Sequence, residues 1–453
     1  MYSRGKIKLN NTEFKFILLD DNLEIIFDDM NDAKSVSDIY YNNGVFSFTG
    51  MESLNYSTFT GVGDDGRIYD FHITSSHLTF NKSFECKVCY YAIYYNLRDV
   101  NNPNKKRLKF SGNEIDGMAN YNTLYQHIYN SNMSLTAIDL EPFRNKNAEK
   151  HSFEIDNINY SISFVDGYTT NSSAKFPIEF KNCISLEISN INKIDEYYKN
   201  HVKVKNLLSF IYHRRNIRFE NIKIQSYDGQ YYFDIGEFVV FDSKSIVEEV
   251  DKKRCVKYEQ ISTIFTTLTQ QIFNNDLHLD HIPSSFTSNR TISAGSFVIL
   301  LAAFQYEFDR FYKVEHKPKS IELRNEMYDE ISKLKDNSNG KKRKKYEIII
   351  DHLDDDQLEA KILQIFKIYP EAIKKLGERI YLRNGFKFEK NDIAKRLAKQ
   401  RNDFAHGNIK NDFKQICIVD YLLLEKIVYF IQLVNLGLEI NSAIEISDRV
   451  TIG

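Results

Sequence analysis

The chain has 453 residues, of which 42% are hydrophobic and 14% aromatic, so it is long enough for two or three domains with sizeable apolar cores. Its formal net charge of −2 excludes a protein that coats nucleic acid over its whole surface, and any contact with RNA has to be confined to a patch. Five Cys, an odd number without a regular framework, are typical of a reducing compartment.

The hydrophobic segments are too short for export or for a membrane span. Residues 1–20 contain no apolar stretch of signal-peptide length, because single hydrophobic residues alternate with Lys and Asn. The most apolar internal run extends only from Phe297 to Phe304. The apolar segment near the C-terminus is interrupted by Asp420, Glu425, Lys426 and Gln432. We therefore expect a soluble, cytoplasmic protein with no membrane partner.

Short alternating segments dominate the chain from Lys6 to about Phe241. Lys6-Ile7-Lys8-Leu9 and Ser185-Leu186-Glu187-Ile188 have the period of two that is typical of half-buried strands, and turn signals such as Asp228-Gly229 separate such segments. One helical stripe interrupts them, from Ile194 to Tyr212. We predict a β-rich N-terminal domain over residues 1–245.

Three motifs in this domain could carry chemistry. Cys86-x-x-Cys89 lies in a strand-like stretch without a second Cys pair, which favours ordinary strand residues over a metal site. Arg67 and His72 are five residues apart in another alternating stretch, where they should point to opposite faces. The basic segment 213–218, His-Arg-Arg-Asn-Ile-Arg, could meet RNA phosphates.

Helical periods dominate from about Glu248 onward. The expected helices are Tyr258 to Phe273, Ala294 to Tyr312, Ser320 to Leu334, Gln357 to Tyr369, Asn391 to His406 and Phe413 to Leu438. They predict an all-α helical bundle over residues 246–453, and the whole chain is therefore expected to be α+β. The helix from Ala294 is apolar almost all round and should be central.

Two charged features of the bundle are candidates for supporting roles. Glu307 lies among Phe304, Phe308 and Phe311, and its carboxylate could hold Arg401 or simply reach solvent. The second feature is a basic run that follows the loop 336–340 and could contact RNA or be a solvated loop. This run consists of Lys341, Lys342, Arg343, Lys344 and Lys345. His278-Leu279-Asp280-His281, before Pro283, is more typical of a solvated loop than of a metal site.

The predicted helix from Asn391 to His406 carries the strongest chemical signal. Asn391 or Asp392 can cap its start, and Gly407 suits the left-handed position after its end. Arg401 lies within about 60° of the apolar residues Leu397 and Phe404, where a permanent charge needs a partner. His406 falls on the last turn, rotated by about 140° from Arg401. One helix therefore builds half a site, and two copies related by a two-fold axis would bring both pairs into one cleft.

The hexad Arg401-Asn402-x-x-x-His406 resembles the Arg-x4-His signature of HEPN ribonucleases, which carry Asn, Asp or His after the Arg. The chain around it resembles the ApeA-like anti-phage proteins, in which a β-rich N-terminal domain precedes a C-terminal HEPN domain. The resemblance implies a metal-independent endoribonuclease without a cofactor, active as a homodimer or higher homo-oligomer in abortive infection. It also favours a supporting role for Glu307, because related helices often carry an acidic residue there.

These residues have the chemistry that RNA cleavage requires. An imidazole such as His406 transfers protons near neutral pH, and the guanidinium of Arg401 stabilises charge on a phosphate. Asn402 is better suited to positioning, because an amide does not titrate. We expect cleavage of host or phage RNA, with tRNA among the candidates, and a phage-derived trigger sensed by the N-terminal domain.

Two other classes of protein fit the same composition. In the first, the chain is a non-catalytic dimer whose HEPN-like bundle only binds RNA or another ligand. In the second, a sugar-binding β domain is fused to an effector, which is suggested only by the aromatic content.

Overall fold

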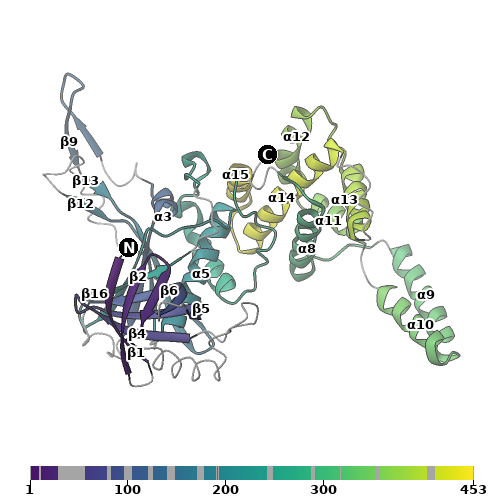
Figure 1. Ribbon diagram of the computed structural model, residues 1–453. Helices are drawn as coiled ribbons and strands as arrows, with labels where there is room; N and C mark the ends of the chain where they lie inside the picture. The colour runs from purple at the N-terminus through teal and green to yellow at the C-terminus, as the bar shows by residue number, and fades with distance from the viewer. Residues whose placement is uncertain are drawn as a thin grey trace. The chain divides into compact units, whose positions relative to one another are not determined.

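The computed structural model describes residues 2–9, 12–28, 57–78, 83–95, 105–120, 126–139, 148–170, 178–189, 191, 193–241, 248–286, 291–316, 318–353, 357–405 and 414–451. The chain divides into two compact units, Met1–Asp276 and Leu277–Gly453. The first is rich in strands and the second is helical, which confirms the predicted α+β class (Figure 1). The division lies later than the residue 245 expected from sequence, because helix α7 (Phe265–Phe273) packs on strand β10 and helix α5 of the first unit.

A twelve-stranded antiparallel sheet organises the first unit. Its strands, in chain order, are β1 (Tyr2–Leu9), β2 (Thr12–Leu19), β3 (Asn22–Ile26), β4 (Ser57–Gly63), β5 (Ile68–Leu78), β6 (Ser83–Tyr94), β7 (Lys106–Ser111), β10 (His151–Ile155), β11 (Ile158–Val165), β14 (Cys183–Ile188), β15 (Asn221–Tyr227) and β16 (Tyr232–Val240). The hairpins β8 (Gln126–Tyr129) with β9 (Leu135–Asp139), and β12 (Tyr168–Thr170) with β13 (Ile178–Phe180), stand outside this sheet.

Strand β6 joins the two halves of the sheet. Along one edge it pairs with β5 from Phe84 to Tyr94. Along the other edge its first half pairs with β3 and its second half with β16. Strands β1 to β6 therefore close into a ring, in the order β6-β3-β2-β1-β4-β5 and back to β6, and the remaining six strands continue from β16.

The ring encloses its own apolar core, and its first strand alternates as the sequence predicts. In β1, Ile7 and Leu9 are buried while Lys6 and Lys8 are exposed. The other strands of the ring send aromatic and branched side chains to the same interior, including Phe16, Phe71, Phe84 and Tyr91. Every strand of the ring has a neighbour on both sides, although β1 and β4 pair only from Gly5 to Ile7.

Helix α5 (Ile194–Tyr212) covers part of this unit and forms within the bounds predicted from sequence. Val204, Leu207 and Leu208 form a buried stripe, and the side chain of Glu196 accepts a hydrogen bond from the backbone N–H of Lys193 at 3.0 Å, which caps the N-terminus. The helix packs on β5, β6 and α7. The predicted helix from Tyr258 is broken into α6 (Tyr258–Ile261), a 3-10 turn (Ser262–Ile264) and α7.

The second unit is a bundle of helices (Figure 1). They are α8 (Ala294–Phe311), α9 (Pro318–Asp336), α10 (Gly340–Leu353), α11 (Leu358–Ile368), α12 (Pro370–Arg383), α13 (Lys390–Ala405), α14 (Gln415–Asn435) and α15 (Ile440–Val450). Helices α10, α12 and α15 were not predicted from sequence. The first turns of α10 are strongly charged, whereas α12 and α15 each carry an amphipathic stripe that could have indicated them.

Helix α14 lies at the centre of this bundle, where it packs on α8, α12, α13 and α15. Its side chains from Tyr421 to Leu433 are buried almost without interruption. The prediction that the helix from Ala294 is the central one was wrong, since Ile299, Tyr306 and Phe311 of α8 remain exposed. Polar residues inside α14 therefore face other helices rather than water, and their partners determine how the bundle is arranged.

Candidate functional site

The helix that carries Arg401 forms as predicted. Helix α13 spans Lys390–Ala405, and Ile393 and Leu397 of its apolar stripe are buried. Phe404 continues the stripe and meets Phe297 of α8 edge-on, with ring centroids 5.4 Å apart. The C-terminal end of α13 is therefore held against α8, and the side chains of this last turn are placed by that contact.

Arg401 and Asn402 lie side by side near this end of α13. Arg401 is half-buried at the border of the apolar stripe, and its Nη1 donates a hydrogen bond to Oδ1 of Asn402 at 3.3 Å. Asn402 is exposed. The amide can thus orient the guanidinium while both groups stay accessible to a phosphate. His406 directly follows Ala405 and lies outside the described residues, so its geometry with Arg401 stays a prediction.

A second arginine on the same helix has a different role. Arg396 donates from Nε to Oδ2 of Asp420 on α14 at 2.7 Å and from Nη2 to Oδ1 at 2.8 Å. Asp420 is fully buried and also accepts a hydrogen bond from the Tyr381 hydroxyl of α12. The hydrogen bond to Asp420 raises the pKa of Arg396, so the guanidinium stays charged near neutral pH.

The Arg396 pair fixes the rotation of α13. Arg396 and Arg401 are five residues apart and are rotated by about 140° about the helix axis. With Arg396 directed to α14, Arg401 is turned away from it. Sequence analysis missed this anchor, although Asp420 in a largely apolar helix was a signal that a cation had to be found elsewhere in the fold.

Glu307 neither pairs with Arg401 nor reaches solvent, so both positions considered for it from sequence are corrected. It is fully buried, and its oxygens accept hydrogen bonds from Nε2 of Gln432 and Nδ2 of Asn435, each at 3.3 Å. Burial raises its pKa above the usual range. Gln432 also donates to the backbone carbonyl of His278 at 3.0 Å. Glu307 therefore ties α8 to α14 inside the bundle, because the polar residues of α14 lie nearer to it than Arg401 does.

The basic run of the helical unit is not a loop. Lys341, Lys342, Arg343, Lys344 and Lys345 occupy the first turn and a half of α10, and all five are exposed. Consecutive residues wrap around a helix, so these charges surround its N-terminal end instead of lining one face. Arg343 also pairs with Glu347 one turn later, at 3.4 Å. These residues stay candidates for RNA contact.

The basic segment of the β-rich unit is largely internal. Arg214 is completely buried between Glu114, 2.7 Å away, and Glu248, 3.4 Å away. His213 is also buried, and burial lowers its pKa to about 3. The hypothesis that the whole segment meets RNA phosphates was therefore wrong, because its central Arg neutralises two carboxylates of the same unit.

The remaining sequence motifs are structural. Cys86 is buried in β6 and Cys89 is half-buried three residues later, as expected for strand residues. Arg67 is exposed and paired with Asp65, whereas His72 is buried, 3.1 Å from Asp195, so the two do not share a site. The loop with His278 and His281 is only partly as expected, because His281 is buried. No group of His, Cys, Asp and Glu among the described residues could hold a metal ion.

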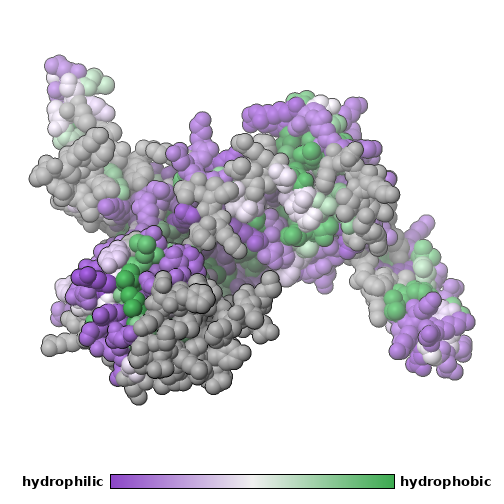
Figure 2. Space-filling model, viewed as in Figure 1, coloured by the Kyte–Doolittle hydropathy of each residue, from purple (hydrophilic) through white to green (hydrophobic). Residues whose placement is uncertain are grey.

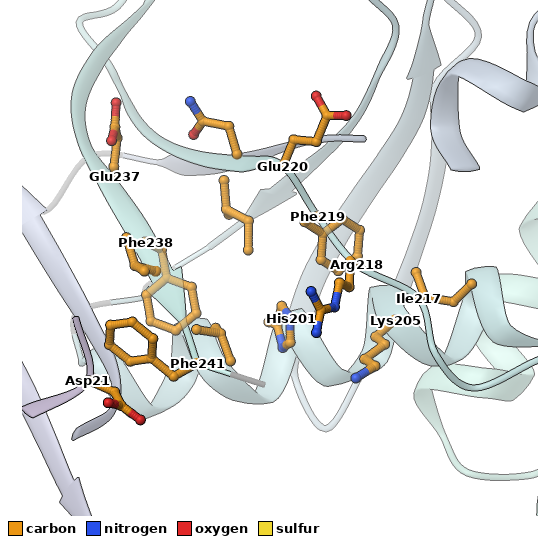
Figure 3. Close-up of a pocket in the computed structure, with 14 residues that line it drawn as sticks. Asp21, His201, Lys205, Ile217, Arg218, Phe219, Glu220, Glu237, Phe238 and Phe241 are labelled. Atoms are coloured by element: carbon orange, nitrogen blue, oxygen red, sulfur yellow. The ribbon is translucent and has the colours of Figure 1, made fainter. Parts of the chain in front are cut away.

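A cavity of about 440 Å³ in the β-rich unit was not predicted from sequence (Figure 3). Its apolar wall includes Phe219, Phe238 and Phe241, and its basic groups are His201, Lys205 and Arg218. Figure 3 shows these three basic side chains close together, with Glu220 and Glu237 pointing to another side.

Two of the acidic residues of this cavity already have partners. Asp21 forms an ion pair with Lys87, and Glu237 accepts a hydrogen bond from the Tyr95 hydroxyl at 2.8 Å. His201 and Lys205 are one turn apart on α5 and so share a helix face. The basic side of the cavity, next to aromatic rings, is suited to a small anion with a flat apolar part.

No helix within the described ranges is both long and apolar enough to cross a membrane. No family model matches the chain, and no curated protein and no solved structure matches it either.

Proposed function

We propose that the chain is a HEPN endoribonuclease that acts in abortive anti-phage defence and cleaves host or phage RNA without a metal ion. The observation that carries the proposal is the position of Arg401. Its half-buried guanidinium lies beside Asn402 at the end of α13, five residues before His406, on a helix whose rotation is set by the Arg396–Asp420 pair. A charge kept at the edge of an apolar stripe, when another Arg already anchors the helix, is better explained by a ligand than by packing.

The proposed reaction is an internal transfer within RNA. The ribose 2′-oxygen attacks the adjacent phosphorus while the bond to the 5′-oxygen of the next nucleotide breaks. One His406 imidazole takes the proton of the 2′-hydroxyl, or gives a proton to the departing 5′-oxygen. Arg401 stabilises the extra negative charge of the crowded phosphate, and Asn402 orients it. The products are a 2′,3′-cyclic phosphate and a 5′-hydroxyl end.

The proposed site is composite. A base and an acid are needed at the same phosphate, and one chain carries a single His406. A two-fold axis beside the C-terminal ends of two α13 helices would supply both imidazoles and both guanidinium groups. The proposed enzyme is therefore at least a homodimer.

The β-rich unit is proposed to regulate this activity. An RNase that cuts the RNA of its own cell has to be held inactive until a signal arrives, and binding can shift the balance only if it favours one state. The cavity with His201, Lys205 and Arg218 offers a place for such a signal, and the chemistry of its wall suits an anionic small molecule produced during phage infection.

A non-catalytic RNA-binding dimer is the alternative, and exposed Lys341 to Lys345 on α10 favour it to the same extent as the enzyme. The chemistry of the RNA ends in cells distinguishes the enzyme from the binding module. Cells that express the intact chain should accumulate RNA fragments with 2′,3′-cyclic phosphate ends, and cells that express His406→Ala should not. If both kinds of cell gave the same RNA ends while the protein still bound RNA, the binding-module alternative would hold.

A further inference from the structure

Helices α9 and α10 form a hairpin that lacks a core of its own (Figure 1). Residues 337–339 connect them, and Gly340 takes the left-handed backbone conformation, φ +59°, that the tight connection requires. Ser338 in the connection is the one buried residue of the hairpin among those described. Paired helices normally draw most of their stability from an apolar face buried against a neighbour, and here the apolar residues are exposed or half-buried.

The exposed apolar residues occupy more than one side of α9. Leu323, Met327 and Leu334 share a face, because they are four and seven residues apart, and they are 58%, 42% and 49% exposed. Ile321 and Tyr328, seven residues apart, form a second face that is also exposed. One neighbouring helix can cover only one of these faces. Figure 2 shows hydrophobic residues at the surface of this hairpin next to a strongly hydrophilic part.

Charge is segregated along the hairpin. The tip, residues 333–345, contains Lys333, Lys335 and the basic run of α10, against Asp336 as its acidic residue. The opposite end carries Glu322, Glu326, Asp329 and Glu330 on α9 and Glu347 on α10, with Lys319 and Arg324 as its basic residues. The hairpin is thus basic at its tip and acidic at its base.

We propose that two copies of this hairpin pair antiparallel, tip against base, to form a four-helix bundle between two chains. The antiparallel arrangement places each basic tip beside an acidic base. With a two-fold axis, both copies use the same surface of the hairpin for the contact. It also covers the faces of Leu323 and Tyr328 that the hairpin leaves exposed. A parallel pair would juxtapose like charges, so the charge pattern selects both the partner, a second copy, and its direction.

This association does not depend on RNA chemistry. Where the proposed nuclease function holds, this association keeps two chains together, and the basic run then serves the hairpin contact instead of RNA. The composite site itself needs a further contact between the C-terminal ends of the two α13 helices. A dimer that fails to cleave RNA would leave the association intact and remove the proposed function. If the charge-reversed variants still assembled and cleaved RNA, the proposed function would stand and the hairpin association would be removed.

Charge reversal at each end of the hairpin tests the proposal in the full-length chain. The tip variant carries Lys341→Glu, Lys342→Glu, Lys344→Glu and Lys345→Glu, and the base variant carries Glu322→Lys, Glu326→Lys and Glu330→Lys. Each variant makes both ends of the hairpin alike in charge, so each should raise the dimer dissociation constant by about a hundredfold, as like charges across an interface are strongly unfavourable. An equimolar mixture should restore the dimer as a heterodimer, because a wholly acidic hairpin then meets a wholly basic one.

The measurement is sedimentation velocity over a range of concentrations, with circular dichroism to show that the helices persist. Lys374→Glu, Lys375→Glu and Arg379→Glu on the exposed face of α12 form a control of similar charge change and should leave the dimer intact. Wild-type-like dimers from both hairpin variants, or a mixture that stays monomeric, would overturn the proposal. A tip variant that remains dimeric but loses RNA binding would assign the basic run to RNA.

Discussion

Arg396 of α13 and Asp420 of α14 form a two-pronged ion pair, with Nε–Oδ2 and Nη2–Oδ1 distances of 2.7 and 2.8 Å, and the carboxylate is fully buried. Five residues later, Arg401 has one hydrogen bond to its exposed neighbour Asn402. Arg396 therefore has a structural role, whereas Arg401 of the same helix is left for the proposed chemistry.

Arg396→Met should destabilise the helical unit by about 3 kcal/mol, because it leaves the buried Asp420 carboxylate without its cation. Arg401→Met should change stability by about 0.5 kcal/mol or less, since that side chain has no buried partner. Urea unfolding followed by circular dichroism measures both. Equal losses of stability for the two variants would contradict the division of roles.

His406→Ala and Arg401→Ala should each abolish RNA cleavage and growth arrest, because proton transfer and stabilisation of the phosphate charge are lost. A chelator such as EDTA should leave wild-type cleavage unchanged. The assay is the release of 2′,3′-cyclic phosphate ends from total RNA by purified protein. Arg67→Ala is the control, because Arg67 and His72 repeat the spacing outside the helical unit, where Arg67 is exposed just before strand β5. Full cleavage by His406→Ala, or its loss with EDTA in the wild type, would refute the mechanism.

The β-rich unit should lose stability in acid through His213. Burial lowers the folded-state pKa of His213 to about 3 from an ordinary value of 6.5, so the unfolded chain takes up a proton first as the pH falls. Its contribution is present above pH 6.5 and is lost toward pH 3, by at most about 1.4 kcal/mol per pH unit.

The variant His213→Asn tests this pH dependence. His213 caps α5 in the left-handed conformation, φ 50°, which Asn tolerates. The free energy of unfolding of the variant, measured by urea titration at several pH values, should fall less steeply below pH 6.5 than that of the wild type. Parallel pH curves would show that other groups govern the acid response.

Lys205→Glu with Arg218→Glu should abolish the response to phage without lowering the amount of folded protein, because the basic side of the cavity would repel an anionic signal. Lys199→Glu with Arg215→Glu is the matched control, since these exposed residues lie on the same helix and the same connection but do not line the cavity. Plating efficiency of phage on cells that express each variant is the readout. Protection equal to the wild type from the cavity variant would exclude this cavity as the sensor.

Residues 277–453 alone should fold as a helical dimer, retain cleavage that depends on Arg401 and His406, and lose any response to phage, because they form a compact unit of their own. Light scattering, RNA cleavage and phage plating measure the three properties. A fragment that folds and responds to phage like the full chain would place the sensor in the helical unit.

Local sequence patterns were sufficient to predict an element when all the signals for it lie within its own residues. Helix α5 forms within its predicted bounds, and α13 begins one residue before the predicted start, because apolar stripes and end signals lie within the helix itself. Alternation likewise predicted strand β1 of the ring. Helix α10 was not predicted, because its first turns carry charged residues instead of an apolar stripe.

Partners that are distant along the chain could not be predicted in the same way. Arg214 reaches Glu114 across 100 residues and Arg396 reaches Asp420 across 24. Glu307 is buried and accepts hydrogen bonds from Gln432 and Asn435, so it takes neither of the two positions considered from sequence, beside Arg401 or at the solvent. Each buried charge required some counterpart, but the packing of several helices or strands determined which residue supplied it.

The sequence by itself determined the α+β class, the order of a β-rich part before a helical part, and the helix that carries Arg401, since these depend on periods and caps within short segments. Only the tertiary structure decided the closure of the ring through β5 and β6, the basic cavity beside α5, and the pairing that turns Arg396 inward. Those features depend on contacts between residues far apart in the chain, whose geometry is created by the packing of whole elements.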